Sequence, residues 1–344
     1  MKKILITGSG GLIGSEAVEY YCNKGYTVIG IDNNFREYFF GNQGSVSWRI
    51  EELSKHKNYI HYNVDIRNYN SIEDIFKTNG TFDLIIHTAA QPSHDWACKE
   101  PLTDFNVNAV GTTNMLEAYR LYSPEAVFIF TSTNKVYGDT PNRIALHEDE
   151  TRFTPLLPDH KNGFNEWVSI DHCLHSVFGA SKVAADIMVQ EYGKYFNLKT
   201  VVFRGGCLTG QKHSGVELHG FLSYLVKCCV NDIPYTIFGY KGKQVRDNIH
   251  SSDLISAFDA YFESPKTNGE VYNIGGGTYS NCSVLEAITL IETMTNKKLN
   301  YTIKDENRIG DHQWWISDTR KFKRHFPEWK QVYNMERIIE TFIS

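Results

Sequence analysis

The segment KILITGSGGLIG, residues 3–14, decides the fold class of this 344-residue chain. A short apolar run, Lys3–Thr7, passes directly into a glycine-rich turn, and a segment with helical periodicity follows. A glycine pattern placed between a strand and a helix is typical of a dinucleotide-binding site. Gly8 permits the tight turn, Gly11 lets the backbone approach a pyrophosphate, and Gly14 lets the helix pack closely on the strand. The segment therefore predicts the opening βα unit of a Rossmann-type fold.

A carboxylate at the end of the second expected strand indicates which dinucleotide binds. Asp32 lies eighteen positions after Gly14, where its side chain accepts hydrogen bonds from both hydroxyl groups of an adenosine ribose. The same negative charge repels the 2′-phosphate of NADP. Asn33 and Asn34 follow, and Arg36 is the nearest cation. NAD is therefore favoured over NADP as the cofactor.

Short apolar runs alternate with helix-period segments through the first half of the chain. After the opening strand, further strands are expected at Thr27–Ile31, Ile60–Val64, Asp83–His87, Ala126–Thr131 and Thr200–Arg204. Crossover helices are expected at Leu12–Lys24, Ser71–Lys77, Thr103–Leu121 and Val177–Phe196. This order predicts an α/β fold with a doubly wound parallel sheet.

The pattern loosens after Arg204 and predicts a smaller α/β lobe. Strands are expected near Tyr235–Ile237 and Val271–Ile274, and helices near Leu218–Cys229, Val284–Thr295 and Met335–Ile343. We therefore expect an NAD-binding Rossmann domain over residues 1–207, with some later segments returning to its sheet. Residues 208–344 are expected to form the substrate-binding lobe.

Composition and charge exclude several classes of function. The chain is 41% hydrophobic and 22% charged, which is typical of an ordinary globular protein. A net charge of −5 provides no broad basic field, so nucleic acid is not expected as a partner. The sequence contains no run of about eighteen apolar residues, so no membrane span is expected. The seven cysteines are scattered without a CxxC pair, which favours the cytoplasm and predicts no metal site.

Several separated motifs resemble the extended short-chain dehydrogenase/reductase superfamily, which contains nucleotide-sugar epimerases and dehydratases. Besides the glycine turn, the matching segments are Asn108–Thr112, Thr131–Gly138, Ser181-Lys182 and Gly242–Asp247. Dehydratases of this superfamily carry an Asp-Glu pair where this chain has Asn134-Lys135. Eliminating water needs an acid and a base at those positions, so dehydration is not expected.

The resemblance implies a reaction through a transient keto sugar. In such enzymes NAD takes a hydride from a sugar carbon while a base removes the hydroxyl proton, and the keto sugar is then reduced on its other face. Thr133 would hydrogen-bond the reacting hydroxyl. Lys182 would hold the nicotinamide ribose and favour an anionic base nearby.

The chain differs from the superfamily at the position of the catalytic base. The usual tyrosine stands four residues before the lysine, and that position is Phe178, which carries no proton. Our hypothesis for a substitute is His175, three residues earlier and expected on the same helical face. Tyr137 and His94 are alternatives that would line the same cleft. A packing or surface role for His175 is also open.

The strand-end positions and the resemblance together predict two sets of binding residues. The cofactor set is Gly8, Gly11, Leu12, Ile13, Gly14, Asp32, Asn33, Asn34, Asp65, Ile66, Thr88, Ala89, Ala90, Asn108, Thr131, Lys182 and Arg204. The substrate set is Gln91, Ser93, His94, Thr133, Asn134, His219, Tyr235, Arg246 and Arg308. Within the second set, the two arginines are expected to clamp a diphosphate, for which a planar guanidinium is well shaped.

These observations predict an NAD-dependent epimerase of a nucleoside-diphosphate sugar. A CDP-linked sugar is favoured by the nearest resemblance, with reaction at C2 or C4. One alternative is a nucleotide-sugar dehydrogenase or reductase. Another is a sugar-nucleotide-binding protein that lost catalysis through Phe178. The resemblance also implies a homodimer, formed through the helices expected at Thr103–Leu121 and Val177–Phe196.

Overall fold

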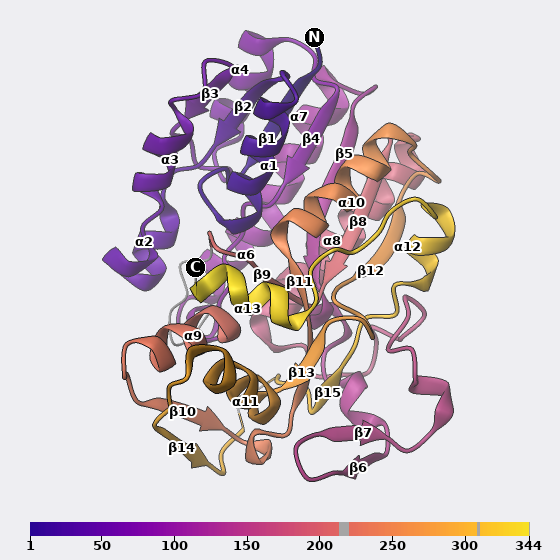
Figure 1. Cartoon of the computed structure of the whole chain (residues 1–344). Coiled ribbons are helices and arrows are strands. Elements are labelled where there is room, and N and C mark those ends of the chain that lie inside the picture. Colours follow the sequence, from indigo (N-terminus) through magenta and orange to yellow (C-terminus); the bar gives the residue numbers. More distant parts are fainter. Residues whose placement is uncertain (213–219, 308–309, 344) are drawn as a thin grey trace. The chain divides into compact units, whose positions relative to one another are not determined.

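The structure is a computed structural model that describes residues 1–212, 220–307 and 310–343 (Figure 1). The chain forms two compact units, each assembled from several segments. Unit 1 consists of Met1–Val136, Val177–Arg204 and Ile255–Tyr272. Unit 2 consists of Tyr137–Ser176, Gly205–Leu254 and Asn273–Ser344.

A seven-stranded sheet in the order β3-β2-β1-β4-β5-β8-β12 forms the centre of the α/β fold. Its strands are β1 (Lys3–Thr7), β2 (Thr27–Ile31), β3 (Tyr59–Tyr62), β4 (Leu84–His87), β5 (Val127–Thr133), β8 (Thr200–Gly205) and β12 (Glu270–Ile274). β1 pairs in parallel with β2 and β4, β2 with β3, and β4 with β5. The strand order reverses between β1 and β4, and ligands of such sheets bind outside the carboxyl ends of the strands at this point.

Helices cover both faces of this sheet, as Figure 1 shows. On one face, α4 (Tyr69–Asn79), α7 (Gly111–Tyr122) and α8 (Ser176–Phe196) share a buried apolar core with alternate strand residues. On the other face lie α1 (Leu12–Asn23) and α10 (Ser251–Glu263), which are joined by a hydrogen bond from Tyr20 to Asp259 of 2.9 Å. The predicted fold class, a Rossmann-type doubly wound sheet, is confirmed.

Several regions of unit 1 differ from the prediction, which placed no helix at α10. The connection from β2 to β3 contains α2 (Phe35–Phe40), a 3₁₀ turn at Asn42–Gly44 and α3 (Ser47–Leu53), where no element was expected. The single helix expected at Thr103–Leu121 is instead α6 (Pro101–Phe105), a π-helical turn at Asn106–Val110 and then α7. π-helical turns occur frequently at functional sites.

Unit 2 has its own core and several small sheets. Helices α9 (Phe221–Val230), α11 (Val284–Thr295) and α13 (Met335–Ile343) pack around a shared apolar cluster. β10 (Tyr235–Phe238) pairs in parallel with β14 (Tyr301–Lys304). β11 (Val245–His250) pairs with β13 (Asn281–Ser283), β15 (Trp314–Trp315) and β9 (Cys207–Thr209).

The remaining α-helices and strands of the described residues are short. They are α5 (His94–Lys99), α12 (Arg320–His325) and the antiparallel hairpin of β6 (Leu146–Glu148) with β7 (Phe153–Pro155). Across the described part of the chain, no helix has both the length and the apolar character needed to cross a membrane.

Candidate active site

The glycine turn closes β1 tightly against its neighbours. Gly8 has a φ of 68°, and a Cβ there would lie 2.8 Å from the backbone nitrogen of Ala89. A Cβ on Gly14 would lie 2.0 Å from the carbonyl oxygen of Gly8, so α1 starts in direct backbone contact with the turn. Since α1 begins at Leu12, the N–H groups of Leu12 and Ile13 belong to the helix's unpaired first turn. Such a terminus attracts anions.

Asp32 at the end of β2 is held beside this turn. Its carboxylate accepts hydrogen bonds from the backbone N–H groups of Gly10 (2.9 Å) and Asn34 (2.8 Å). Burial raises the pKa of Asp32, while these two N–H groups act in the opposite direction. The structure thus places the carboxylate where the sequence analysis expected a ribose-binding group.

The two asparagines after Asp32 are engaged within the protein. The amide of Asn34 accepts from the N–H of Val46 (2.8 Å) and donates to the hydroxyls of Ser45 (3.0 Å) and Ser47 (2.9 Å). It thereby fastens the loop before α3, whose Val46 lies against Gly10 of the turn. This position was expected to bind the cofactor, and its side chain instead braces the loop beside the cofactor turn.

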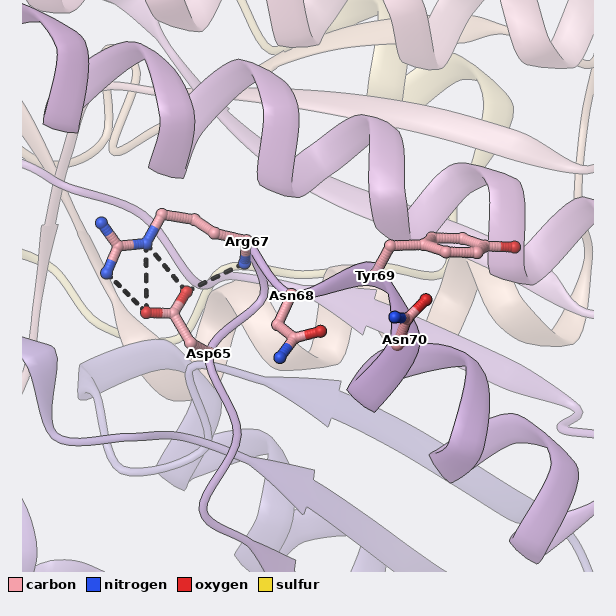
Figure 2. Close-up of a pocket in the computed structure, with 5 residues that line it drawn as sticks. All are labelled: Asp65, Arg67, Asn68, Tyr69 and Asn70. Carbon is pink, nitrogen blue, oxygen red and sulfur yellow. Dashed lines mark hydrogen bonds and ion pairs between the residues drawn. The ribbon is translucent and has the colours of Figure 1, made fainter.

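A pocket of about 480 Å³ opens after β3, and Figure 2 shows its lining. Asp65 receives two-pronged hydrogen bonds from Arg67, with Nη2 to Oδ2 at 2.6 Å, and a further one from Asn33 at 3.1 Å. Burial raises the pKa of Asp65, but the bonds from Arg67 outweigh it and the pKa is lowered. The side chains of Asn68, Tyr69 and Asn70 complete the lining. Sequence reasoning named Asp65 and missed its partner, Arg67.

Ile66 does not line this pocket. It is 6% exposed and packs in the core, where it would meet a Cβ on Gly111 at 2.6 Å. Thr88, Ala89 and Ala90 do follow β4 at the switch point, and the hydroxyl of Thr88 donates to the carbonyl of Thr7 (2.7 Å).

A buried histidine joins the ends of β1 and β4 to α7. His87 contacts the hydroxyl of Thr7 through Nδ1 (2.6 Å) and that of Thr112 through Nε2 (2.9 Å). The Thr112 hydroxyl donates its own proton to the carbonyl of Asn108 (2.6 Å), so Nε2 of His87 must carry the ring proton. Burial, assisted by the charge of Lys182, lowers the pKa of His87 to about 3. The ring is therefore neutral in the folded protein.

This shift predicts a specific sensitivity to acid. The unfolded imidazole takes a proton as the pH falls below its ordinary pKa of 6.5, while His87 in the folded protein does so only near 3. The folded state should lose up to about 5 kcal/mol between those values. We expect His87→Gln to remove this loss.

The measurement is urea unfolding of both proteins from pH 7 to pH 3.5, with His147→Gln on the exposed β6–β7 hairpin as a control. The stability advantage of the wild type over His87→Gln should shrink steadily as the pH falls. An advantage that stays constant would show that His87 does not titrate in this way.

A second buried network ties the loop after β4 to α8. The amide of Gln91 donates to Asp104 (2.7 Å), and its N–H donates to the side chain of Asn108 (2.9 Å). Asn108 in turn donates to the hydroxyl of Ser181 (3.0 Å) and to Asp104 (3.1 Å). The N–H of Ser93 donates to Oε1 of Gln91 (2.5 Å). Gln91 and Ser93, expected to touch the sugar, are buried and serve as supports.

Lys182 follows Ser181 on α8 and lies at the carboxyl end of β5. Its ammonium donates to the carbonyl of Thr131 (3.1 Å) and lies 4.3 Å from the centre of the Phe130 ring. Burial lowers the pKa of Lys182 to about 8, although the charges of Asp186 and Asp104 act against this. Burial therefore destabilises the charged form of Lys182, and a further polar partner would stabilise it.

Thr133 and Asn134 follow on the same strand end, and their side chains lie 3.4 Å apart. The hydroxyl of Thr133 also accepts from the N–H of Lys135 (3.2 Å). Both sit within unit 1 with Lys182.

Arg204 forms a buried ion pair within unit 1. It is 5% exposed and forms a two-pronged pair with Asp186 of α8, at 2.8 and 3.0 Å. Asp186 also accepts from the hydroxyl of Ser132 (2.6 Å). The arginine expected at the cofactor thus fastens α8 to β8 and β5, because a buried guanidinium needs a carboxylate partner.

The structure separates the three candidates for the missing base. α8 begins at Ser176 with a φ of 63°, so His175 precedes the helix and the expected shared face with Phe178 is wrong. His175 instead lies 3.4 Å from the thiol of Cys173. Tyr137 is fully buried and donates to Asn273 (2.8 Å), so it does not line a cleft.

The third candidate, His94, contacts Phe178 directly. The two ring centres lie 4.8 Å apart, and the rings are inclined by 59°. Both residues belong to unit 1.

The remaining substrate candidates lie in unit 2. Arg246 is paired with Asp311 at 2.5 Å and donates to the carbonyl of Val245 (2.7 Å). Tyr235 on β10 is half-buried, with its ring 6.0 Å from that of Tyr224. His219 and Arg308 lie outside the described residues.

A protein-family model matches most of the chain. The model of the "NAD dependent epimerase/dehydratase family" matches residues 4–275, which contain the glycine turn, β4, β5 and α8. The chain belongs to this family. The expected family, enzyme class and NAD cofactor are thereby confirmed.

Curated relatives extend over nearly the whole chain. CDP-paratose 2-epimerase of Salmonella typhi is 35% identical over 325 residues, which cover 93% of this chain and 92% of that protein. UDP-glucose 4-epimerase of Drosophila melanogaster is 28% identical, covering 98% and 94%. The motifs that indicated the family therefore belong to a full-length similarity.

Solved structures share the fold. Pal from Bacillus thuringiensis has a TM-score of 0.81 at 24% identity, covering 99% of this chain and 97% of its own. UDP-glucuronic acid 4-epimerase from Bacillus cereus, in complex with UDP-glucuronic acid and NAD, has a TM-score of 0.77 at 23% identity, covering 98% and 97%.

Proposed function

We propose that the protein is an NAD-dependent epimerase of a nucleoside-diphosphate sugar, which works through a transient keto sugar. The observation that carries the proposal is the strand end after β5. The buried Lys182 donates to the carbonyl of Thr131 on β5, the strand that ends at Thr133, and Asn134 and Lys135 follow in place of a carboxylate pair. That set suits oxidation and re-reduction of a hydroxyl carbon and lacks the acid and base that elimination needs.

The residues of unit 1 fit NAD. The first turn of α1 offers the N–H groups of Leu12 and Ile13 to the pyrophosphate, and Asp32 offers a carboxylate to the adenosine ribose. Asp65 and Arg67 stand at the next strand end for the adenine side. Lys182, whose burial is costly, would donate to the nicotinamide ribose. NAD bound there supplies the acceptor and donor of a hydride.

Roles on the substrate side follow from the residues that the family motif shares with this chain. Thr133 would orient the reacting hydroxyl. Arg246, with Asp311 as its counter-charge, would meet the diphosphate, and Tyr235 would lie beside the nucleotide base. A CDP-linked sugar is favoured because CDP-paratose 2-epimerase, at 35% identity, retains the greatest similarity among the relatives reported above.

Two other functions are alternatives, and a specific observation favours the first of them. Phe178 lacks the hydroxyl of the usual base, which favours a protein that binds a sugar nucleotide without turning it over. A dehydrogenase or reductase would use the same NAD site with net consumption of cofactor.

The test incubates the purified protein with catalytic NAD and CDP-, UDP- or GDP-linked sugars, and the sugars are separated by chromatography. We expect one epimer pair to reach equilibrium with no net rise in absorbance at 340 nm. Stoichiometric NADH would indicate a dehydrogenase. Tight binding without any new sugar would indicate a binding protein.

We also propose a homodimer in the cytoplasm. Several large apolar side chains on α6, α7 and α8 are exposed in the single chain, including Leu102, Leu121 and Tyr195. Exposed apolar groups of this size favour an interface between copies. Sedimentation at twice the mass of one chain would support this assembly, and sedimentation as a monomer would contradict it.

A further inference from the structure

We infer that His94 is the proton acceptor that stands in for the hydroxyl missing at Phe178. The inference rests on the proposed epimerase function and names the base for it. His94 is the first residue of α5, and its imidazole lies against the Phe178 ring at 4.8 Å between centres. A tyrosine at 178 would extend its hydroxyl from this same ring. The imidazole therefore lies beside the ring that would carry the hydroxyl of the usual base.

Buried hydrogen bonds link the two backbone segments that carry these side chains. The backbone N–H of Ser93, next to His94, donates to Gln91, and Gln91 is joined to Asn108. Asn108 donates to the hydroxyl of Ser181, which itself donates to the carbonyl of Phe178 (3.0 Å). The loop carrying His94 is thus linked to the helical turn that carries Phe178. A catalytic group needs this kind of support from its neighbours.

His94 also contacts the helix that carries Lys182. Phe178 and Lys182 are four residues apart on α8 and so lie on one helical face. His94 contacts the first of them and is partly exposed, so it can meet a ligand. His87, by contrast, is fully buried, with both ring nitrogens engaged by threonine hydroxyls.

Imidazole is suited to the chemistry. Its ordinary pKa lies close to neutrality, so it takes and returns a proton near physiological pH. NAD bound to unit 1 would accept a hydride from the sugar carbon and would later return it, and His94 would take the hydroxyl proton on its unprotonated nitrogen. The carbon–oxygen bond becomes double. In the return step the reduced cofactor would supply the hydride to the other face of the carbonyl carbon and His94 would give the proton back to that oxygen, so the net change would be inversion.

The test compares His94→Gln with wild type. We expect turnover to fall about 10²- to 10⁴-fold, the usual contribution of a positioned base. The dissociation constant for NAD, measured by calorimetry, should stay within about threefold, because His94 supports proton transfer rather than cofactor binding. The double variant His94→Gln/Phe178→Tyr should recover at least about tenfold over His94→Gln, since it restores an acidic hydroxyl on the same ring. His147→Gln, on the exposed β6–β7 hairpin, is the matched control.

A second readout needs neither cofactor nor turnover. In the NAD-free protein, Phe178→Leu removes the aromatic ring, so the imidazole proton signals of His94 should move in the NMR spectrum while those of His147 stay. Unmoved His94 signals would contradict the contact.

Failure of the proposed His94 role and failure of the proposed epimerase function give different results. Wild-type turnover together with full activity of His94→Gln would overturn the role of His94 and leave the epimerase standing. A loss in His175→Gln with none in His94→Gln would overturn it in favour of His175. A wild type that interconverts no sugar nucleotide would refute the epimerase proposal, and the inference would fall with it.

Discussion

Replacing Gly14 by alanine is expected to lower the affinity for NAD at least about 100-fold, or by about 2.7 kcal/mol. The added Cβ would lie 2.0 Å from the carbonyl oxygen of Gly8, 2.7 Å from its carbonyl carbon and 2.9 Å from the Cα of Ser9. All three are backbone atoms, so no side chain can rotate away. α1 must shift from the turn, and its N-terminal N–H groups shift with it.

The control must separate cofactor binding from general destabilisation. Overpacking at Gly14 should itself cost about 1–3 kcal/mol of unfolding free energy. Gly25 has a φ of 78° with open space around it, so Gly25→Ala is strained without a clash. We expect Gly25→Ala to lose stability and keep wild-type NAD affinity by calorimetry. Wild-type NAD affinity in Gly14→Ala would show that the cofactor does not depend on this turn.

Replacing Lys182 by methionine is expected to lower turnover strongly while making the protein more stable at pH 7. The folded-state pKa of about 8 lies below the ordinary value of 10.5, so keeping the buried ammonium charged destabilises the fold by up to about 3 kcal/mol. Asp104 loses a nearby positive charge in the variant, which offsets part of the gain. Turnover should fall at least about 100-fold because the reacting centre loses its cation.

The stability difference between Lys182→Met and the wild type should depend on pH. Below pH 8 the lysine is charged in both states, and the destabilisation is complete. Between pH 8 and 10.5 the folded lysine loses its proton while the unfolded one keeps it, so the wild type gains stability as the pH rises. The advantage of Lys182→Met in urea unfolding should therefore be constant from pH 6.5 to 7.5 and shrink toward pH 10. Lys199→Met, at an exposed pair with Glu125, should show no such trend. A constant advantage across the whole range would contradict a depressed pKa at Lys182.

The sequence was most informative where local chemistry alone determines the backbone. β1 and β2 begin and end where the apolar runs predicted, because an apolar run closed by glycine or aspartate has few alternatives in a parallel sheet. The segment Phe35–Leu53 shows no clear periodicity, since its two short helices are fixed by an aromatic cluster and by the amide of Asn34. Such tertiary contacts are not visible in local sequence.

The dependence on tertiary contacts also explains the wrong predictions at the candidate active site. Helical spacing suggested His175, but that argument holds only inside a helix, and α8 starts one residue later. His94 lies far from Phe178 in sequence, and only the fold brings their rings together. Arg204 ends a strand near the cofactor motif, yet its partner on α8 determines its role.

A crystal structure of the protein grown with NAD tests the central claim most directly. The account predicts the pyrophosphate at the turn of Gly8–Gly14, a ribose on Asp32 and the nicotinamide ribose within hydrogen-bonding distance of Lys182. A turn that stays empty at saturating NAD, or a dinucleotide bound elsewhere on the chain, would contradict it.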